Sequence, residues 1–185
     1  MKELKALNKL RTNLLKFSVS KDETRLHLNS IWHDDKLGAL VSTNGHHATI
    51  LRSRYSPELS DKLIDPVTYQ LINRDAVKIA AVVPSKYKTK LTYTIETHHF
   101  SKMIKGRPTI THFFEDGSIS IGGNSSEWGA GKTRLFSVNA AFLKHLVGRS
   151  YHVGINTDLS PVSFALDNEE LGLANDIFLI MPLKV

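Results

Sequence analysis

The chain has 185 residues, of which 41% are apolar and 23% charged, a composition typical of a folded globular protein. This length allows one large domain or two small ones with buried cores. The absence of cysteine excludes disulfides and thiolate metal sites, and no apolar run is long enough to predict a signal peptide or a membrane span. We therefore expect a cytoplasmic protein without membrane contact.

The chain is basic, with 24 Lys and Arg against 18 Asp and Glu, a net charge of +6. Such a charge favours a polyanionic partner, because each cation placed near a phosphate releases condensed counterions. Charge alone does not identify nucleic acid as that partner, so the distribution of the lysines along the chain has to decide.

The first segment, from Lys2 to about Lys16, is predicted to be an amphipathic helix. At about 100° per residue one side gathers the leucines and the opposite side the lysines, while Arg11 falls among the leucines. Two interpretations stay open: a surface helix with a solvated lysine face, or a helix laid across phosphates. The leucines are Leu4, Leu7, Leu10, Leu14 and Leu15, and the lysines are Lys2, Lys5, Lys9 and Lys16.

Short alternating segments after this helix predict a small antiparallel meander, with turn residues at 34–36 and at Asn44-Gly45. A second round is predicted to contain a strand near Val67, a helix from Arg74 to Val83 that Asn73 caps and Pro84 ends, and further strands. The strands predicted in these two rounds are 25–32, 38–42, 48–52, 90–96, 109–114 and 118–121.

A third round follows a Gly/Ser-rich connection at 122–131. Asn139 is expected to cap a helix from Ala140 to Val147, which Gly148 ends. The fold class predicted is α+β, with about three units of strand, helix and antiparallel strands and the helices on one face of the sheets. We expect two units in residues 1–125 and the third in 126–185. The strands predicted in this round are 135–138, 151–156, 162–166 and 177–181.

Two stretches of the chain resemble the bacterial DNA polymerase III β subunit, the DNA sliding clamp, in a shortened form. Residues 21–29 and 41–48, including Thr43-Asn44-Gly45-His46, are similar to a strand and the T-D-G-H turn of the clamp's middle domain. Residues 136–139, 160–162 and 180–185, which end in Met-Pro-Leu-Lys-Val, resemble the close of its last domain. The resemblance covers roughly half of the chain, and residues 55–132 match no family.

In the clamp family these two stretches form the walls of a hydrophobic groove that receives short peptides of polymerases, the clamp loader and repair enzymes. Asn44, His47 and Lys184-Val185 depart from the usual Asp, Arg and Arg-Leu. Taken alone, Asn-Gly is also typical of a type I′ hairpin turn, and the apolar tail of a buried edge strand. The groove residues implied are Thr43, Gly45, His46, His47, Leu179, Met181, Pro182, Leu183 and Val185.

The resemblance also implies a closed homo-oligomeric ring whose helices line a hole for duplex DNA. The lysine face of the first helix would then meet phosphates without reading bases. The chain is about half as long as a typical clamp subunit, so four copies of three units each, or six of two, would close a twelve-unit ring. The DNA-binding residues predicted are Lys2, Lys5, Lys9, Lys16, Arg74, Lys78, Lys144 and Arg149.

Other chemistry lacks support in the sequence. Gly129 to Thr133 resembles a phosphate loop, but Ser126 stands where the first glycine belongs and a strand follows. The paired histidines, His46-His47 and His98-His99, lack zinc-ligand spacing. We therefore expect no enzyme, no cofactor and no metal. The alternatives to a clamp are a clamp mimic or inhibitor that forms no ring, and an unrelated basic nucleic-acid-binding module.

Overall fold

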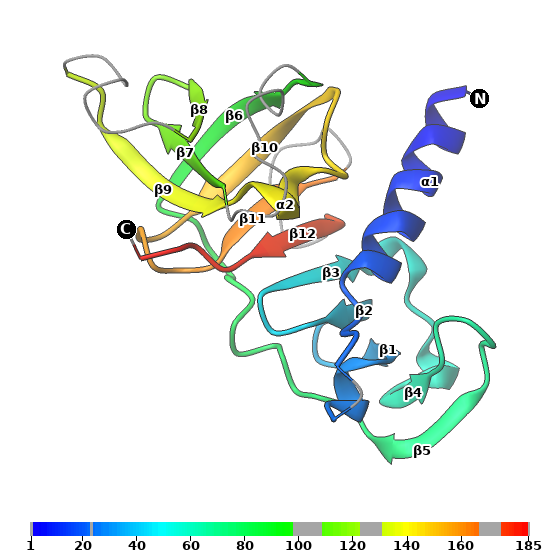
Figure 1. Cartoon of the computed structure of the whole chain (residues 1–185). Helices are drawn as coiled ribbons and strands as arrows, with labels where there is room; N and C mark the ends of the chain where they lie inside the picture. Colours follow the sequence, from blue (N-terminus) through cyan, green and yellow to red (C-terminus); the bar gives the residue numbers. More distant parts are fainter. Residues whose placement is uncertain (1, 23, 98–108, 123–130, 167–174, 185) are drawn as a thin grey trace.

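The computed structural model of the chain describes residues 2–22, 24–97, 109–122, 131–166 and 175–184 (Figure 1). Within these ranges the chain forms two α-helices, three short 3-10 helices and twelve strands. The strands form a nine-stranded sheet in the order β5-β4-β1-β2-β3-β12-β11-β10-β6 and a three-stranded sheet in the order β8-β7-β9. All named strand pairs are antiparallel, which confirms the predicted fold class.

The first helix and the meander after it form close to the residues predicted. Helix α1 spans Lys2–Phe17. The strands that follow are β1 (Ile31–Asp34), β2 (Ala39–Thr43) and β3 (His47–Leu51). The predicted strand 25–32 is wrong over most of its length, because Leu26–Leu28 form a 3-10 turn, η1.

Residues 57–83 differ most from the prediction. Strands β4 (Lys62–Ile64) and β5 (Leu71–Asp75) form an edge hairpin, so the predicted helix 74–83 is wrong. Val77 and Ile79 instead pack against the sheet, where tertiary contacts outweigh helix propensity. The strand predicted near Val67 is also wrong, because the Asp65 carboxylate accepts hydrogen bonds from the Val67 and Thr68 amides and forms a turn.

The second half of the chain supplies the remaining strands and the second helix. Asn139 caps α2 (Ala140–Leu143) as predicted, since its side chain accepts a hydrogen bond from the Ala141 amide at 2.9 Å. The helix is shorter than predicted, and residues 144–147 continue as turns up to Gly148, whose φ is +86°. The strands are β6 (Thr89–Ile95), β7 (Ile110–Phe114), β8 (Ile119–Ile121), β9 (Arg134–Asn139), β10 (Arg149–Ile155), β11 (Val162–Ala165) and β12 (Ile177–Ile180).

The predicted boundary at 125/126, like most of the predicted linker 122–131, falls within residues 123–130, outside the described residues. Strands from the two sides of this boundary pair with one another. β6 pairs with β10 along seven residues, and β7 pairs with β9. Residues 1–125 and 126–185 therefore share both sheets.

The nine-stranded sheet carries one hydrophobic cluster on each face, because successive strand residues point to opposite sides. On one face the buried Leu10, Leu14 and Leu15 of α1 pack with residues such as Phe178, and Leu143 of α2 joins the same cluster. On the other face Trp32, Val41, Ile50 and Leu179 pack beneath Ile79. Both helices thus lie on one face of this sheet.

Gly154 allows the segment before β6 to lie against the sheet. A Cβ atom added at Gly154 would lie 2.5 Å from Cδ1 of Tyr87, closer than packed carbon atoms approach. We predict that Gly154→Ala lowers the free energy of unfolding by about 1–3 kcal/mol, the usual cost of overpacking. In a Tyr87→Ala background the same substitution should cost less than half as much. Denaturant unfolding of the four proteins tests this, and an equal cost in both backgrounds would contradict the assignment.

Candidate functional site

The β2–β3 turn, one predicted wall of the groove, is built around Asn44. Its side-chain oxygen accepts hydrogen bonds from the His46 amide at 2.9 Å and the His47 amide at 3.1 Å. The Thr43 hydroxyl donates to the His47 carbonyl at 2.8 Å. Gly45 has a positive φ of +89° and Asn44 does not, so the turn is not the type I′ turn considered above. Gly45 and His46 are exposed, whereas Thr43 and His47 are buried.

His47 is fixed by an aromatic cluster at the end of α1. Its ring stacks on Phe17 with centroids 4.4 Å apart, and the Phe142 ring meets it edge-on at 4.8 Å. The ring centroid of Phe178, in β12, lies 5.4 Å from that of His47. The turn, α1, α2 and β12 are therefore joined through one imidazole.

The hydrogen bonds of His47 define its protonation state. Asn44 Nδ2, 3.0 Å from His47 Nε2, can only donate, so Nε2 is the acceptor. Nδ1 then carries the proton and donates to the Ser18 hydroxyl at 3.1 Å, and the Ser18 and Thr49 hydroxyls share a hydrogen bond of 2.8 Å. Burial, with smaller effects from His46, His145 and Lys144, lowers the pKa of His47 from 6.5 to about 3. The ring is neutral and supports the turn from beneath.

The C-terminal tail lies directly beside this turn. Ile180 of β12 is paired with His47 of β3, and the Met181 amide donates to the His46 carbonyl at 2.9 Å. The Leu183 amide donates to the Ser137 carbonyl at 2.8 Å, so the tail continues to β9. The two segments that sequence reasoning placed together do meet in the fold.

The predicted groove residues divide into a surface set and a supporting set. Met181 and Leu183 are each 37% exposed, unusual for large apolar side chains, and Pro182 is half-buried. Together with Gly45 and His46 they form the accessible part. Thr43, His47 and Leu179 are buried, with Leu179 in the cluster on the sheet face opposite α1, and Val185 lies outside the described residues.

Helix α1 presents its lysines as predicted. Lys5, Lys9 and Lys16 are exposed, and Lys2 lies in the first turn, with its side chain outside the described set. Leu4 is 60% exposed rather than packed, because the N-terminal end of α1 extends beyond the sheets (Figure 1). Arg11, the exception in the pattern, is buried in an ion pair with Asp176, Nε to carboxylate oxygen 2.5 Å.

The other predicted cations are scattered. Arg74 is exposed on edge strand β5 instead of a helix, and Lys78 lies between Val77 and Ile79, which pack on the sheet face opposite α1. These two residues therefore cannot extend the lysine face of α1. Lys144 does join α1, because its Nζ lies 4.7 Å above the Phe17 ring. Arg149 is half-buried at the start of β10.

Sequence reasoning missed a basic groove of about 850 Å³ between the end of α1, the β2–β3 turn and α2. Phe17, Phe142 and His145 supply aromatic surface. The lining also contains the cations Lys16, Lys21, Arg25 and Lys144, and the acidic Asp22, which pairs with Arg25. Such a groove suits a phosphate or another anion beside a flat apolar group. The sequence feature that could have indicated this groove is the pair Lys144-His145. Its position beside Phe17 results from the tertiary fold and is not visible in the sequence.

Comparison with solved structures places this geometry in a known fold. The DNA polymerase sliding clamp of Bacillus subtilis matches 97% of this chain at 17% identity, with a TM-score of 0.59. The DNA polymerase III β subunit of Borrelia burgdorferi matches with a TM-score of 0.65 at 14% identity, and that of Thermotoga maritima with 0.63 at 15%. The chain has the DNA sliding-clamp fold. It spans 62–64% of the length of these clamps, and the recognition made from the two sequence stretches is confirmed at the level of the fold.

The clamp fold extends over residues 55–132 where described, although no family resemblance was visible there. No protein-family model and no curated protein sequence matches the chain. No helix among the described residues is long and apolar enough to cross a membrane. Among those same residues, no group of three or more His, Asp or Glu side chains could hold a metal ion.

The neutral state of His47 makes the stability of the clamp fold depend on pH. In the unfolded chain the His47 ring, with its ordinary pKa of 6.5, becomes protonated below pH 6.5. In the folded protein the same ring stays neutral down to about pH 3, its lowered pKa. Stability from His47 is therefore complete above pH 6.5 and is lost as the pH falls. We predict that His47→Gln is more destabilising at pH 8 than at pH 5 by about 2 kcal/mol.

Urea unfolding of the wild type and the variant at both pH values measures this difference. His46→Gln, which removes an exposed imidazole from the same turn, is the matched control. An equal effect of His47→Gln at the two pH values would contradict a buried neutral ring.

Proposed function

We propose that this protein is a shortened, non-catalytic DNA sliding clamp. It encircles duplex DNA as a homo-oligomer and tethers DNA polymerase, a clamp loader or other partners through a hydrophobic peptide groove. The observation that carries this proposal is the meeting of the β2–β3 turn with the tail, Met181 amide to His46 carbonyl, inside a fold that matches clamps over 97% of the chain. Its place in the cell would be the nucleoid.

Electrostatics support contact between the helix face and DNA. The leucines of α1 are buried against the sheet from Leu10 onward, so its exposed lysines project from the same face of the sheet as α2. Lys144 and the basic groove continue this charge beside the end of α1. A row of cations on rigid elements attracts phosphates without sequence preference, as a sliding protein requires.

Ring closure would use the edges of the nine-stranded sheet. Among the described strands, β5 and β6 stand at its two ends, and each pairs with one neighbour only. A strand at the edge of a sheet is a template for pairing with another chain. An edge-to-edge contact between β5 of one copy and β6 of the next would be head-to-tail, and such contacts close into a ring when the rotation between copies divides a full turn. The division of the chain into repeat units, and with it the number of copies per ring, stays a prediction.

The lysine face predicts a specific salt dependence of DNA binding. Replacing Lys5 and Lys9 with Gln should lower the slope of log affinity against log salt by about two, since each phosphate contact contributes about 0.9. Lys36→Gln/Lys78→Gln changes net charge equally at exposed positions outside α1, with Lys78 beside residues that pack on the opposite sheet face, and should leave the slope unchanged. Fluorescence anisotropy with a duplex at several salt concentrations measures both. Equal slopes for the two double variants would mean that DNA does not lie along α1.

The tail predicts a separate effect on partner binding. Met181→Glu and Leu183→Glu should each weaken binding of a hydrophobic clamp-binding peptide at least tenfold, because the exposed apolar contact is replaced by a charge. The melting temperature should stay near the wild-type value, as for most surface substitutions. Val67→Glu, at a position 80% exposed outside the groove, is the control.

Calorimetric titration of the wild type and the variants with the peptide distinguishes a tail that binds partners from a tail that only packs against the protein. If the two tail variants unfold more easily but bind the peptide normally, the tail serves packing alone. Normal peptide binding by a chain that stays monomeric would instead indicate a clamp mimic without a ring.

A further inference from the structure

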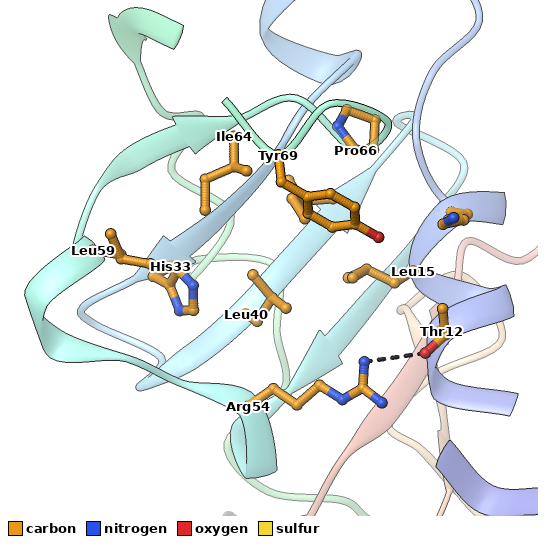
Figure 2. Close-up of a pocket in the computed structure, with 11 residues that line it drawn as sticks. Thr12, Leu15, His33, Leu40, Arg54, Leu59, Ile64, Pro66 and Tyr69 are labelled. Atoms are coloured by element: carbon orange, nitrogen blue, oxygen red, sulfur yellow. Dashed lines mark hydrogen bonds between the residues drawn. The ribbon is translucent and has the colours of Figure 1, made fainter. Parts of the chain in front are cut away.

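A second cavity, of about 300 Å³, lies between α1 and the β4–β5 hairpin, away from the turn and tail (Figure 2). It is lined from several elements that are distant in sequence. The lining residues are Thr12, Leu15, Lys16, Ile31, His33, Leu40, Arg54, Leu59, Ile64, Pro66 and Tyr69.

The walls of this cavity are apolar. Leu15, Ile31, Leu40 and Ile64 are buried, with 4–8% of each side chain still exposed, and they come from α1, β1, β2 and β4. Leu59 adds a partly buried wall from η3 (Pro57–Leu59). An apolar body that filled this space would be held on most sides by rigid elements, as ligand sites require.

The polar groups of the cavity are hydrogen-bond donors. Arg54, in η2 (Arg52–Arg54), is half-buried, and its guanidinium donates to the Thr12 hydroxyl at 3.1 Å and the Asn8 carbonyl at 3.3 Å. It forms no ion pair with a carboxylate among the described residues. Lys16 adds a second cation, and no acidic side chain is among the described residues that line the cavity. A guanidinium without a counter-ion beside apolar walls favours an organic anion.

His33 adds a neutral donor. Its Nδ1 accepts a hydrogen bond from the Ser56 amide at 3.0 Å, so in the neutral ring Nε2 carries the proton. Burial lowers the pKa of His33, which keeps the ring neutral. The cavity therefore offers an N–H group in addition to its cations.

Tyr69 covers the cavity in an unusual backbone conformation. Its φ is +59°, a region that residues other than glycine seldom adopt. The turn is fixed by the Asp65 carbonyl, which accepts from the Tyr69 amide at 2.9 Å, and Figure 2 shows the ring over the cavity with its hydroxyl directed toward α1. Strain of this kind persists where the surrounding structure imposes it, often at ligand sites.

We propose that this cavity binds a small organic carboxylate with a compact apolar body. The body lies against Leu15, Leu40 and Ile64, the carboxylate meets the Arg54 guanidinium, and the Tyr69 ring covers the opening. The volume is at the lower end of the range for ligand pockets, which limits the ligand to a medium-chain or bicyclic aromatic acid. This site shares Lys16 with the proposed DNA surface and lies apart from the proposed peptide surface, and the proposal depends on neither function.

Calorimetric titration of the full chain with octanoate, 2-naphthoate and octan-1-ol tests the proposal. Octan-1-ol has a chain of the same length as octanoate without the charge, so octanoate should bind at least tenfold more tightly. Arg54→Met should remove that advantage, whereas Arg74→Met, at an exposed arginine outside the lining, should preserve it. Absence of binding by both acids, or equal binding of octanoate to Arg54→Met and the wild type, would overturn the proposal.

A second variant keeps the test valid if Arg54→Met fails to fold. Tyr69→Gly removes the cover and suits a positive φ, so the variant should still fold. It should bind both acids at least fivefold more weakly. Unchanged affinity of this folded variant would show that the acids bind elsewhere.

Discussion

The pairing of β3 with β12 is the interaction on which the rest of the structure depends. It joins residues 47–51 to residues 177–180 across more than a hundred residues of chain and unites the two halves of the nine-stranded sheet. Asp176, at its end, is 1% exposed, and its carboxylate accepts from the Ser53 amide at 2.9 Å and pairs with Arg11 of α1. Because a buried carboxylate is stable only when paired, α1, β3 and β12 are held in one arrangement.

Both proposed surfaces follow from this pairing. On the helix-bearing face, the Arg11 ion pair and the buried leucines orient α1 so that its lysines point to solvent. At the end of the pairing, His47 lies beside Ile180, which brings the exposed His46 next to Met181. A clamp needs a cationic face for DNA and an apolar groove for partners, and one junction positions the segments that we propose for both.

The sequence predicted these features where the signal is local. The leucine periodicity specified α1, the turn residues specified the β1–β2 and β2–β3 hairpins, and the two family-like stretches indicated the clamp fold. The prediction failed between Lys62 and Val83, where residues 71–75 form an edge strand and Val77 and Ile79 cover the sheet. The spacing of apolar residues in this segment fits a helix and also fits an irregular segment that covers an apolar sheet face. The local pattern does not distinguish the two, because Trp32, in the cluster against which Val77 and Ile79 pack, is distant in sequence. For the same reason Lys144 could not be placed over Phe17, nor could the burial of His47 be foreseen.

The most direct test of a topological clamp is retention on DNA of different topology. The protein, with a clamp loader if one is needed, would be loaded on a nicked circular duplex, separated from free protein by gel filtration at high salt, and measured again after the circle is cut once. The account predicts an oligomer that remains on the circle and dissociates when the DNA becomes linear. Equal, salt-sensitive retention on circular and linear DNA would contradict it and reduce the protein to a clamp-like binding module.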